Sequence, residues 1–399
     1  MKDGGECRQK KQMITADGFI AHLRSRGIDF FCGVPDSLLK SFCACLTETE
    51  AGNHIITANE GGAVGLAAGH YLATGKLACV YMQNSGQGNA VNPLLSLADP
   101  DVYSVPMLLL VGWRGEPGVH DEPQHVKQGK VTLTLFETLG IPVKVLPADE
   151  QGALQAVDEI VAIAKAESRP VALVVRKGTF VERSLANIRP DLSDLKREDA
   201  IETILKALPN DVVVVSTTGM ISREVYETRI RLGQDHSRDF LTVGSMGHAI
   251  MIATGIAKAD RKRKVVCLDG DGAAIMQMGN LAIAAQSKCG NLLHIVLNNS
   301  AHDSVGGQPT VGGSIDFTEI AQAIGYEVIR PGWDVLLHAT DQERLVSMLK
   351  TAGDWGADGD RLRFMEVRVR KGARKDLGRP KEPPQVNKKL FMETLSRDE

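Results

Sequence analysis

The sequence lacks any apolar run long enough to cross a bilayer, and no apolar stretch follows its polar, basic first residues. We therefore expect neither a membrane partner nor a secretory signal, and we predict a cytoplasmic protein. A surplus of basic residues is also missing. The sequence has 46 Lys and Arg residues and 49 Asp and Glu residues. The resulting formal net charge of −3 argues against a nucleic-acid partner.

A disulfide framework is not indicated either. The cysteines are odd in number and mostly embedded in apolar runs, which predicts reduced, buried thiols. They are Cys7, Cys32, Cys43, Cys45, Cys79, Cys267 and Cys289. Cys43 and Cys45 are too close together, and too isolated from other ligand types, for a metal site.

Short apolar runs alternate with helical patterns along the whole chain, which is typical of parallel sheets covered by helices on both faces. At 399 residues the chain suits two domains. We predict an α/β fold with one such domain at 1–185 and another at 197–371, no middle domain, a linker within 180–196, and an extended tail at 372–399. The expected strands are 30–34, 54–58, 77–83, 106–112, 143–146, 171–176, 212–216, 240–243, 264–268, 292–297 and 364–369.

One pair of polar strand ends stands out in the second domain. Asp269-Gly270-Asp271-Gly272 directly follows the strand at 264–268, and one helix is expected next, from the spacing of apolar residues between 275 and 285. The following strand ends in Asn298-Asn299-Ser300. Because parallel strands end at the same edge of a sheet, Asp271 and Asn299 are expected to lie close together.

The chemistry of this pair suits a magnesium ion bound to phosphate. Asp271 and Asn299 offer hard oxygen ligands, and Gly270 and Gly272 let the backbone approach an anion at the start of the following helix. A phosphate-binding lysine of the G-x-x-x-x-G-K-[ST] type is absent from the sequence. A tight turn capped by Asp271 would explain Gly-Asp-Gly alone, but the paired Asn at the next strand end favours the metal site.

Gly270-Asp271-Gly272 followed by Asn298-Asn299 resembles the diphosphate-binding motif of thiamine-diphosphate enzymes. The resemblance implies thiamine diphosphate and Mg²⁺ as cofactors. It implies three metal ligands, namely Asp271, the Asn299 amide and the carbonyl of Ala301.

The resemblance also implies a glutamate that hydrogen-bonds the aminopyrimidine ring of the cofactor, at the start of a small-residue helix in the other domain. Residues 55–63 fit this description, and Glu60 is the candidate. Taken alone, Glu60 would be read as an acid that complements a helix dipole. Beside the diphosphate motif, the catalytic reading is favoured.

Two further turns resemble parts of the same site. In Gly244-Ser245-Met246-Gly247, the Gly244 carbonyl would accept from the pyrimidine amino group and Met246 would support the bent cofactor, although core methionines are common. Thr217-Thr218-Gly219-Met220 resembles the other diphosphate-side turn, with Gly219 and Met220 as cofactor contacts and Ser222 as a further candidate.

The chain has no room for the extra middle domain of the larger thiamine decarboxylases, and several segments resemble the phosphonopyruvate decarboxylases. These are 33–39, 83–89, 112–118, 121–125 and 302–308. The resemblance implies a lyase that converts phosphonopyruvate to phosphonoacetaldehyde and CO₂ in phosphonate biosynthesis. It also implies a homodimer, or a dimer of dimers, with active sites between chains.

Residues 113–130 are expected to form a long polar loop after a strand, which indicates a binding loop. A substrate with a phosphonate and a carboxylate needs cationic and N–H donors. The candidate catalytic residues besides Glu60 are Asp36, as a proton relay, with His120, Asp121 and His125. The candidate substrate contacts are Arg114, Gln124, Arg223 and His302. Lys127 and Lys130 are expected to be solvated surface charges.

The sequence also bears on other functions. Ser85-Gly86-Gln87-Gly88 starts like a dinucleotide motif, but Val91 stands where the third glycine belongs, so an NAD-dependent dehydrogenase is disfavoured. Sulfopyruvate decarboxylation and carboligation of the acyl carbanion remain open. A catalytically silent regulatory subunit is also open, although the joint presence of Glu60, Asp271 and Asn299 argues against it.

Overall fold

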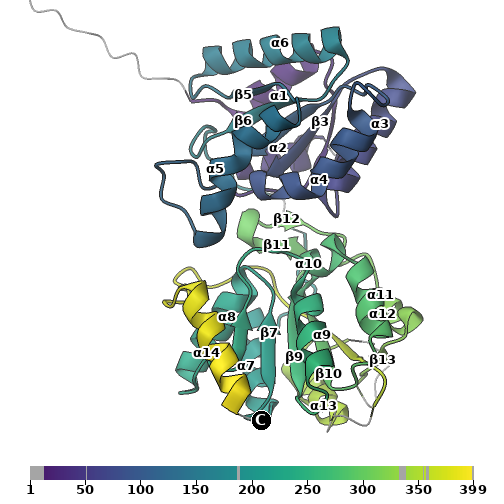
Figure 1. Ribbon diagram of the computed structural model, residues 1–399, viewed down its shortest axis with the longest axis vertical. Coiled ribbons are helices and arrows are strands. Elements are labelled where there is room, and N and C mark those ends of the chain that lie inside the picture. Colours follow the sequence, from purple (N-terminus) through teal and green to yellow (C-terminus); the bar gives the residue numbers. More distant parts are fainter. Residues whose placement is uncertain are drawn as a thin grey trace, which may run out of the picture. The chain divides into compact units, whose positions relative to one another are not determined.

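The computed structural model describes residues 13–50, 52–186, 189–331, 338–353, 355 and 359–397. The chain divides into two compact units, Met1–Ile188 and Arg189–Glu399. Each unit contains one six-stranded parallel sheet, as the alternation of apolar runs and helical patterns predicts (Figure 1). The α/β fold class with no middle domain is confirmed.

The first sheet has the strand order β2-β1-β3-β4-β6-β5. Alternate residues of its strands face opposite layers, so that Phe31 belongs to one core and its neighbour Cys32 to the other. Helices α1 (Ala16–Ser25), α2 (Lys40–Thr49) and α6 (Glu150–Glu167) cover the first face, and α3 (Glu60–Thr74), α4 (Gln87–Pro93) and α5 (Pro123–Thr138) cover the second. The strands are β1 Phe30–Gly33, β2 His54–Ile56, β3 Ala78–Gln83, β4 Leu108–Gly112, β5 Val143–Val145 and β6 Val171–Val175.

The second sheet has the order β13-β14-β10-β9-β7-β8. Helices α7 (Arg197–Ala207), α8 (Met220–Arg231) and α13 (Gln342–Ala352) cover one face. The other face carries α9 (Ala249–Ala259), α10 (Asp271–Met276), α11 (Gly279–Gln286), α12 (Phe317–Ile324) and α14 (Pro384–Arg397). The strands are β7 Val213–Ser216, β8 Asp239–Leu241, β9 Val265–Gly270, β10 Leu292–Asn298, β13 Glu327–Val328 and β14 Arg363–Arg368.

The two units share one topology. If the main-sheet strands of each unit are numbered along the chain, both sheets read 2-1-3-4-6-5 from one edge to the other. In such a sheet the first and third strands are neighbours, and the direction of winding changes between them. That is where open α/β sheets bind ligands, outside the carboxyl ends of the strands.

Several elements differ from the sequence-based expectation. Residues 123–130 are not loop, because α5 begins at Pro123, which is favoured in the first turn of a helix. The single helix expected after Gly272 is two, α10 and α11, separated at Gln277 and Met278. The expected extended tail contains α14, whose Phe391 is buried against Phe240.

Two short pieces were not expected at all. These are the edge strand β13 and a hairpin of β11 (Ala301–His302) with β12 (Gln308–Pro309). Each strand of these pieces has only two residues, too few to show the alternation that marks a strand.

The cysteine prediction is confirmed for the part of the chain that the structure describes. Cys32, Cys43, Cys45, Cys79, Cys267 and Cys289 are all buried and free, whereas Cys7 lies outside the described residues. None of the described helices is long and apolar enough to cross a membrane.

Candidate active site

Glu60 is the first residue of α3 because Asn59 caps the helix, accepting from the backbone N–H of Gly62 at 2.8 Å. The Glu60 side chain is 4% exposed, and its Oε2 accepts from Asn89 Nδ2 at 2.7 Å. Burial raises the pKa of Glu60, and the hydrogen bond from Asn89 offsets part of that rise. The carboxyl group lies against Gly86, where any Cβ would overlap it.

The other first-unit candidates gather around the ends of β1 and β4. Asp36 is fully buried beside Gly112, and its Oδ2 accepts from Leu38 N at 3.0 Å. Burial raises the pKa of Asp36 to about 6, although Arg114 nearby lowers it in part. Arg114 donates to both carboxylate oxygens of Asp121, at 2.8 and 2.5 Å.

The Arg114 guanidinium also donates to Ser37 Oγ at 2.8 Å, which links it to the segment that carries Asp36. The ion pair with Arg114 and two backbone N–H donors hold the pKa of Asp121 well below its usual range. Arg114 therefore has a partner carboxylate within the chain, and Asp121 holds its guanidinium in place.

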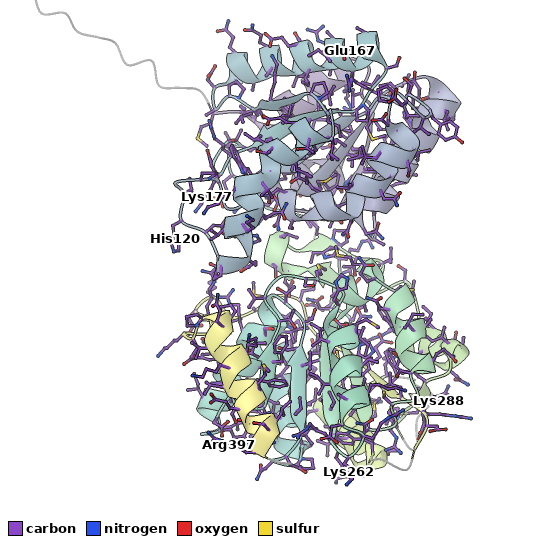
Figure 2. The ribbon with its side chains drawn as sticks, viewed as in Figure 1. His120, Glu167, Lys177, Lys262, Lys288 and Arg397 are labelled. Carbon is purple, nitrogen blue, oxygen red and sulfur yellow. The ribbon has the colours of Figure 1, made fainter. Side chains whose placement is uncertain are left out.

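The histidines expected in this region differ in surroundings. His125 is 8% exposed and its Nδ1 has no hydrogen-bond partner among the described residues. Its Nε2 lies 3.4 Å from Gln124 Nε2, and burial lowers the pKa of His125 to about 4, so the ring is neutral at pH 7. His120 is exposed, on the segment between β4 and α5 (Figure 2).

In the second unit, the register of β9 and β10 places Gly270 opposite Leu297. Asp271 and Asn299 therefore lie just beyond neighbouring strand ends, as the spacing predicts. Asp271 is 2% exposed, accepts from Thr310 Oγ1, and has its pKa raised by burial to about 7. Asn299 is 3% exposed, and its Oδ1 accepts from Ala301 N at 3.1 Å.

Met246 and His302 border the same strand end. A Cβ at Gly272 would lie 2.7 Å from His302 Cε1 and 3.5 Å from Met246 Cε, so both side chains lie next to the Gly-Asp-Gly turn. Gly244 has a positive φ of 73°, and its N–H donates to Thr218 Oγ1 at 2.9 Å. Burial lowers the pKa of His302 to about 4.

The turn after β7 has an unpaired buried hydroxyl. Thr217 Oγ1 has no partner within the described residues, and Gly219, with φ 97°, precedes α8. A buried polar atom beside the first turn of a twelve-residue helix fits an anion such as a diphosphate. Ser222 is instead engaged within the chain, since its Oγ donates to Thr217 O at 2.7 Å.

Arg223 is held by the C-terminal segment. Its guanidinium donates to the carbonyl of Gly378 at 2.6 Å and to that of Leu377. The structure thus places Arg223 against the start of the tail, on α8, whereas the other predicted substrate contacts lie on other elements.

Several residues of these surroundings were not predicted. Asn89 and Thr310 contact the candidate carboxyls Glu60 and Asp271, and Asp303 contacts Asn299. Asn89 lies in a segment whose resemblance to the phosphonopyruvate decarboxylases was noted, so its position could have been considered. Thr310 comes 39 residues after Asp271 and has no local signal.

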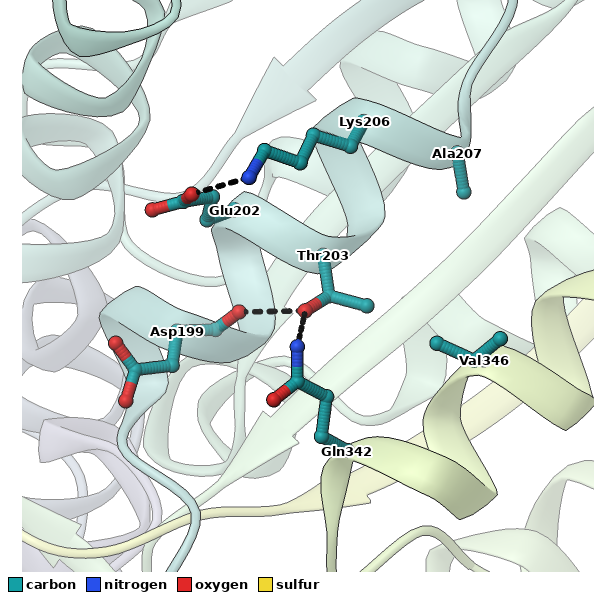
Figure 3. A pocket seen from close by; sticks show the side chains of 7 residues that line it. All are labelled: Asp199, Glu202, Thr203, Lys206, Ala207, Gln342 and Val346. Carbon is teal, nitrogen blue, oxygen red and sulfur yellow. Dashed lines mark hydrogen bonds and ion pairs between the residues drawn. The ribbon is translucent and has the colours of Figure 1, made fainter.

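A pocket of about 440 Å³ lies elsewhere in the second unit, between α7 and α13. Thr203 Oγ1 there donates to Asp199 O and accepts from Gln342 Nε2, and Lys206 pairs with Glu202 (Figure 3). None of the predicted site residues is among those that line this pocket.

The donor set of the second unit fits the expected magnesium ion. A buried carboxylate and a buried amide oxygen, held at adjacent strand ends, are the hard ligands that Mg²⁺ takes together with phosphate oxygens. The unpaired Thr217 hydroxyl and the close approach at Gly272 fit a bound diphosphate beside the ion.

Comparison with known proteins agrees with this geometry. Residues 13–135 match the family model for the thiamine pyrophosphate enzyme N-terminal TPP binding domain, and residues 218–362 match that for the C-terminal TPP binding domain. The phosphonopyruvate decarboxylase of Streptomyces hygroscopicus is 35% identical over 96% of this chain and 94% of its own length.

Two further relatives cover most of the chain. The phosphonopyruvate decarboxylase of Streptomyces viridochromogenes is 34% identical over 93% of this chain and 92% of its own length. The sulfopyruvate decarboxylase of Methanosarcina acetivorans is 29% identical, over 76% of this chain and 81% of its own length.

Proposed function

The chain belongs to the thiamine pyrophosphate enzyme family, and from that membership we propose that it decarboxylates phosphonopyruvate to phosphonoacetaldehyde and CO₂. The observation that carries the substrate is the similarity to two phosphonopyruvate decarboxylases across nearly the whole chain. The enzyme is a carbon–carbon lyase that acts on a small 2-oxo acid.

We propose that thiamine diphosphate acts together with Mg²⁺. Asp271, the Asn299 amide oxygen and the Ala301 carbonyl would hold the ion, and the turn at Thr217–Met220 would face the diphosphate. When bound, the cofactor supplies an electron sink for the pair of electrons left on the substrate as CO₂ departs. Gly270, Gly272, Gly244 and Met246 shape the surroundings of its rings and diphosphate.

Glu60 would hold a proton at the pyrimidine end of the cofactor. Its buried carboxyl has a raised pKa, so it holds a proton more readily than an exposed carboxylate does. The bond from Asn89 fixes Oε2, which leaves Oε1 to act as the proton-transferring atom.

Around the substrate, we propose that Arg114, held by Asp121, supplies charge for an anionic group. The neutral His125 ring and Gln124 supply hydrogen-bonding atoms, and both have buried atoms without a partner in the described chain. His120 and His302 are further candidates for substrate contact. Asp36, with a pKa of about 6, can pass a proton at neutral pH.

We propose further that the enzyme works in the cytoplasm as a homodimer, or a dimer of dimers. Glu60 belongs to the first unit and Asp271 to the second. They would serve opposite ends of one cofactor. In the family that the motif resembles, the two domains that share a cofactor come from different chains.

The function is tested by measuring CO₂ release from phosphonopyruvate, sulfopyruvate and pyruvate, with thiamine diphosphate and Mg²⁺. We expect kcat/KM for phosphonopyruvate to exceed that for pyruvate by on the order of a hundredfold, because a missing phosphonate leaves buried donors unpaired at a cost of about 2–3 kcal/mol. Equal values for phosphonopyruvate and pyruvate would contradict the substrate assignment.

Sulfopyruvate decarboxylation is the second candidate, and the Methanosarcina acetivorans relative favours it. A sulfonate and a phosphonate are both tetrahedral anionic groups, so the same donors could serve either. A higher kcat/KM for sulfopyruvate than for phosphonopyruvate in the same assay would select this function. Release of no CO₂ from any of the three would favour the silent subunit.

A further inference from the structure

Arg197, the first residue of α7, lies in a buried ion-pair network close to the predicted metal ligands. Its side chain is 5% exposed and donates to both oxygens of Glu224, at 2.7 and 3.0 Å. A third donor, Nη1, reaches Asp303 Oδ2 at 2.7 Å. The side chains of Glu224 and Asp303 are only 2% and 9% exposed.

Asp303 connects this network to Asn299. Its Oδ2 accepts from Asn299 Nδ2 at 2.7 Å, and both of its oxygens accept from the backbone N–H of Gly372, at 3.1 and 3.2 Å. Asp303 is thus held by α7 and by the segment after β14. Through its hydrogen bond it in turn restricts the orientation of the Asn299 side chain.

The contact with Asp303 determines which way the Asn299 amide faces. An ionised carboxylate only accepts hydrogen bonds, so the amide must turn its NH₂ group toward Asp303. A flipped amide would set two acceptor oxygens 2.7 Å apart. The Asn299 oxygen therefore points away from Asp303, and it is this oxygen that can bind a cation.

The charge of the network is also suited to a nearby cation. One guanidinium and two carboxylates carry a formal net charge of −1, in a place that water barely reaches. Coulomb attraction is stronger there than in bulk water. Neither Arg197, Glu224 nor Asp303 is itself a predicted metal ligand.

We propose that Arg197 and Asp303 are positioning residues for the metal site: together with Glu224 they fix the Asn299 amide with its oxygen toward a divalent cation and add negative charge behind it. This inference rests on the proposed function, because Asn299 is a metal ligand only if that function holds. Outer residues of this kind typically change metal affinity by ten- to a hundredfold.

The test is to titrate Mg²⁺ into the full chain at saturating thiamine diphosphate and to measure the Mg²⁺ affinity by isothermal titration calorimetry. Asp303→Asn removes the negative charge behind Asn299, and if its oxygen takes the place of Oδ2 to accept from Arg197 and Asn299, its NH₂ group faces the Gly372 N–H, which is also a donor. We expect its Mg²⁺ affinity to fall by about ten- to a hundredfold. Arg197→Lys keeps the charge but not the fork of donors, and it should retain part of the affinity lost in Arg197→Met.

A matched control lies in the same unit. Asp239 is fully buried and accepts a forked pair of bonds from Arg229, but it contacts none of the predicted metal ligands. Asp239→Asn should lower thermal stability and leave the Mg²⁺ affinity within about twofold of wild type. If Asp239→Asn weakens Mg²⁺ binding as much as Asp303→Asn does, the positioning role is wrong.

A second variant covers the case in which the unpaired charges prevent folding. The triple variant Arg197→Met, Glu224→Gln, Asp303→Asn leaves no buried charge in the network, and such replacements are often tolerated. It should fold and still bind Mg²⁺ at least tenfold more weakly. Wild-type affinity in this variant would overturn the inference.

Asp271→Ala separates this inference from the proposed function. If the wild-type chain shows no Mg²⁺-dependent binding of thiamine diphosphate, the proposed function fails, and the inference with it. If binding is lost in Asp271→Ala yet unchanged in Asp303→Asn, only the inference fails. Loss in both, with wild-type binding in Asp239→Asn, supports it.

Discussion

Glu60 and Asp36 are both buried carboxyls at strand ends of the first unit, yet they have different partners. Glu60 accepts from a side-chain amide, whereas Asp36 accepts from backbone N–H groups near Arg114. In each case burial favours the protonated form, since a carboxylate loses its hydration on leaving water. Single substitutions at the two positions therefore test different properties.

Glu60→Gln should leave cofactor binding close to that of wild type and abolish nearly all turnover, because it removes a titrating proton and little volume. H/D exchange at the thiazolium C2 of bound cofactor measures the effect directly. Glu50→Gln is a matched control, since Glu50 is equally buried at 4% but pairs with Arg24. Unchanged exchange in Glu60→Gln would contradict the assignment.

Asp36→Asn should change the pH dependence of stability. The folded state raises the pKa of Asp36 from 3.8 to about 6. Between these values the folded chain keeps a proton that the unfolded chain has released, so the free energy of unfolding falls as pH rises through this window and stays low above it. The asparagine does not titrate, so the variant does not lose stability as pH rises. At pH 7 its free energy of unfolding should exceed that of wild type by about 3 kcal/mol.

Urea denaturation of the apo protein at pH 4 and pH 7 measures this difference. At pH 4 the difference should be only about 0.6 kcal/mol, because the folded wild-type carboxyl is protonated there and the unfolded one, with a pKa of 3.8, is about two-fifths protonated. A parallel shift of both values, rather than one found mainly at pH 7, would show that Asp36→Asn acts through packing instead.

At the scale of elements, α14 closes the edge of the second sheet. Asn387 donates to the carbonyl of Asp239 at 2.8 Å and accepts from Leu241 N at 3.3 Å, so a helix side chain pairs with backbone groups of the edge strand β8. Phe391 packs edge-on against Phe240, with ring centroids 5.6 Å apart. An edge strand covered in this way cannot pair with another chain.

Phe391→Ala should therefore lower the free energy of unfolding by about 3 kcal/mol, the usual loss for a buried phenylalanine. Chemical denaturation of the full chain gives the value. Met392→Ala, one residue further along α14 and 59% exposed, should change it by less than about 0.5 kcal/mol. Equal effects at 391 and 392 would mean that α14 does not pack as described.

Most of the main strands could be predicted from sequence because they are apolar runs that both helix layers bury, although β2 and β5 are only partly buried. All six strands of the first sheet, and all except β13 of the second, lie within two residues of their expected bounds. Helix α14 could not be predicted, because prolines and charges precede it and Phe391 is the one residue among those described in the helix that is buried. Such a helix depends on the sheet that it covers.

The pairing of Asp271 with Asn299 was predictable for a related reason, since parallel strands with known ends share an edge. The network of Arg197 was not. Arg197 and Asp303 are 106 residues apart, and although Asp303 lies in the segment 302–308, nothing in the sequence connects that segment with Arg197. Contacts between charged side chains from distant segments leave no local trace in a single sequence.

At the scale of the whole molecule, the proposed site needs one residue from each unit. In mixtures of Glu60→Ala and Asp271→Ala chains, a mixed dimer would have one site with both defects and one with neither. Random association gives about half mixed dimers, so activity should recover to roughly a quarter of wild type. The chains must be co-expressed, and inactive verified heterodimers would mean that each site is built within one chain.

The repeated strand order has a consequence for how such a protein can be encoded. Each unit completes its own six-stranded sheet, so no strand of either sheet is borrowed from the other half of the chain. A gene broken between the codons for Ile188 and Arg189 would still specify two whole folding units. The two halves could then be expressed at different levels, which is not possible when a single reading frame encodes both.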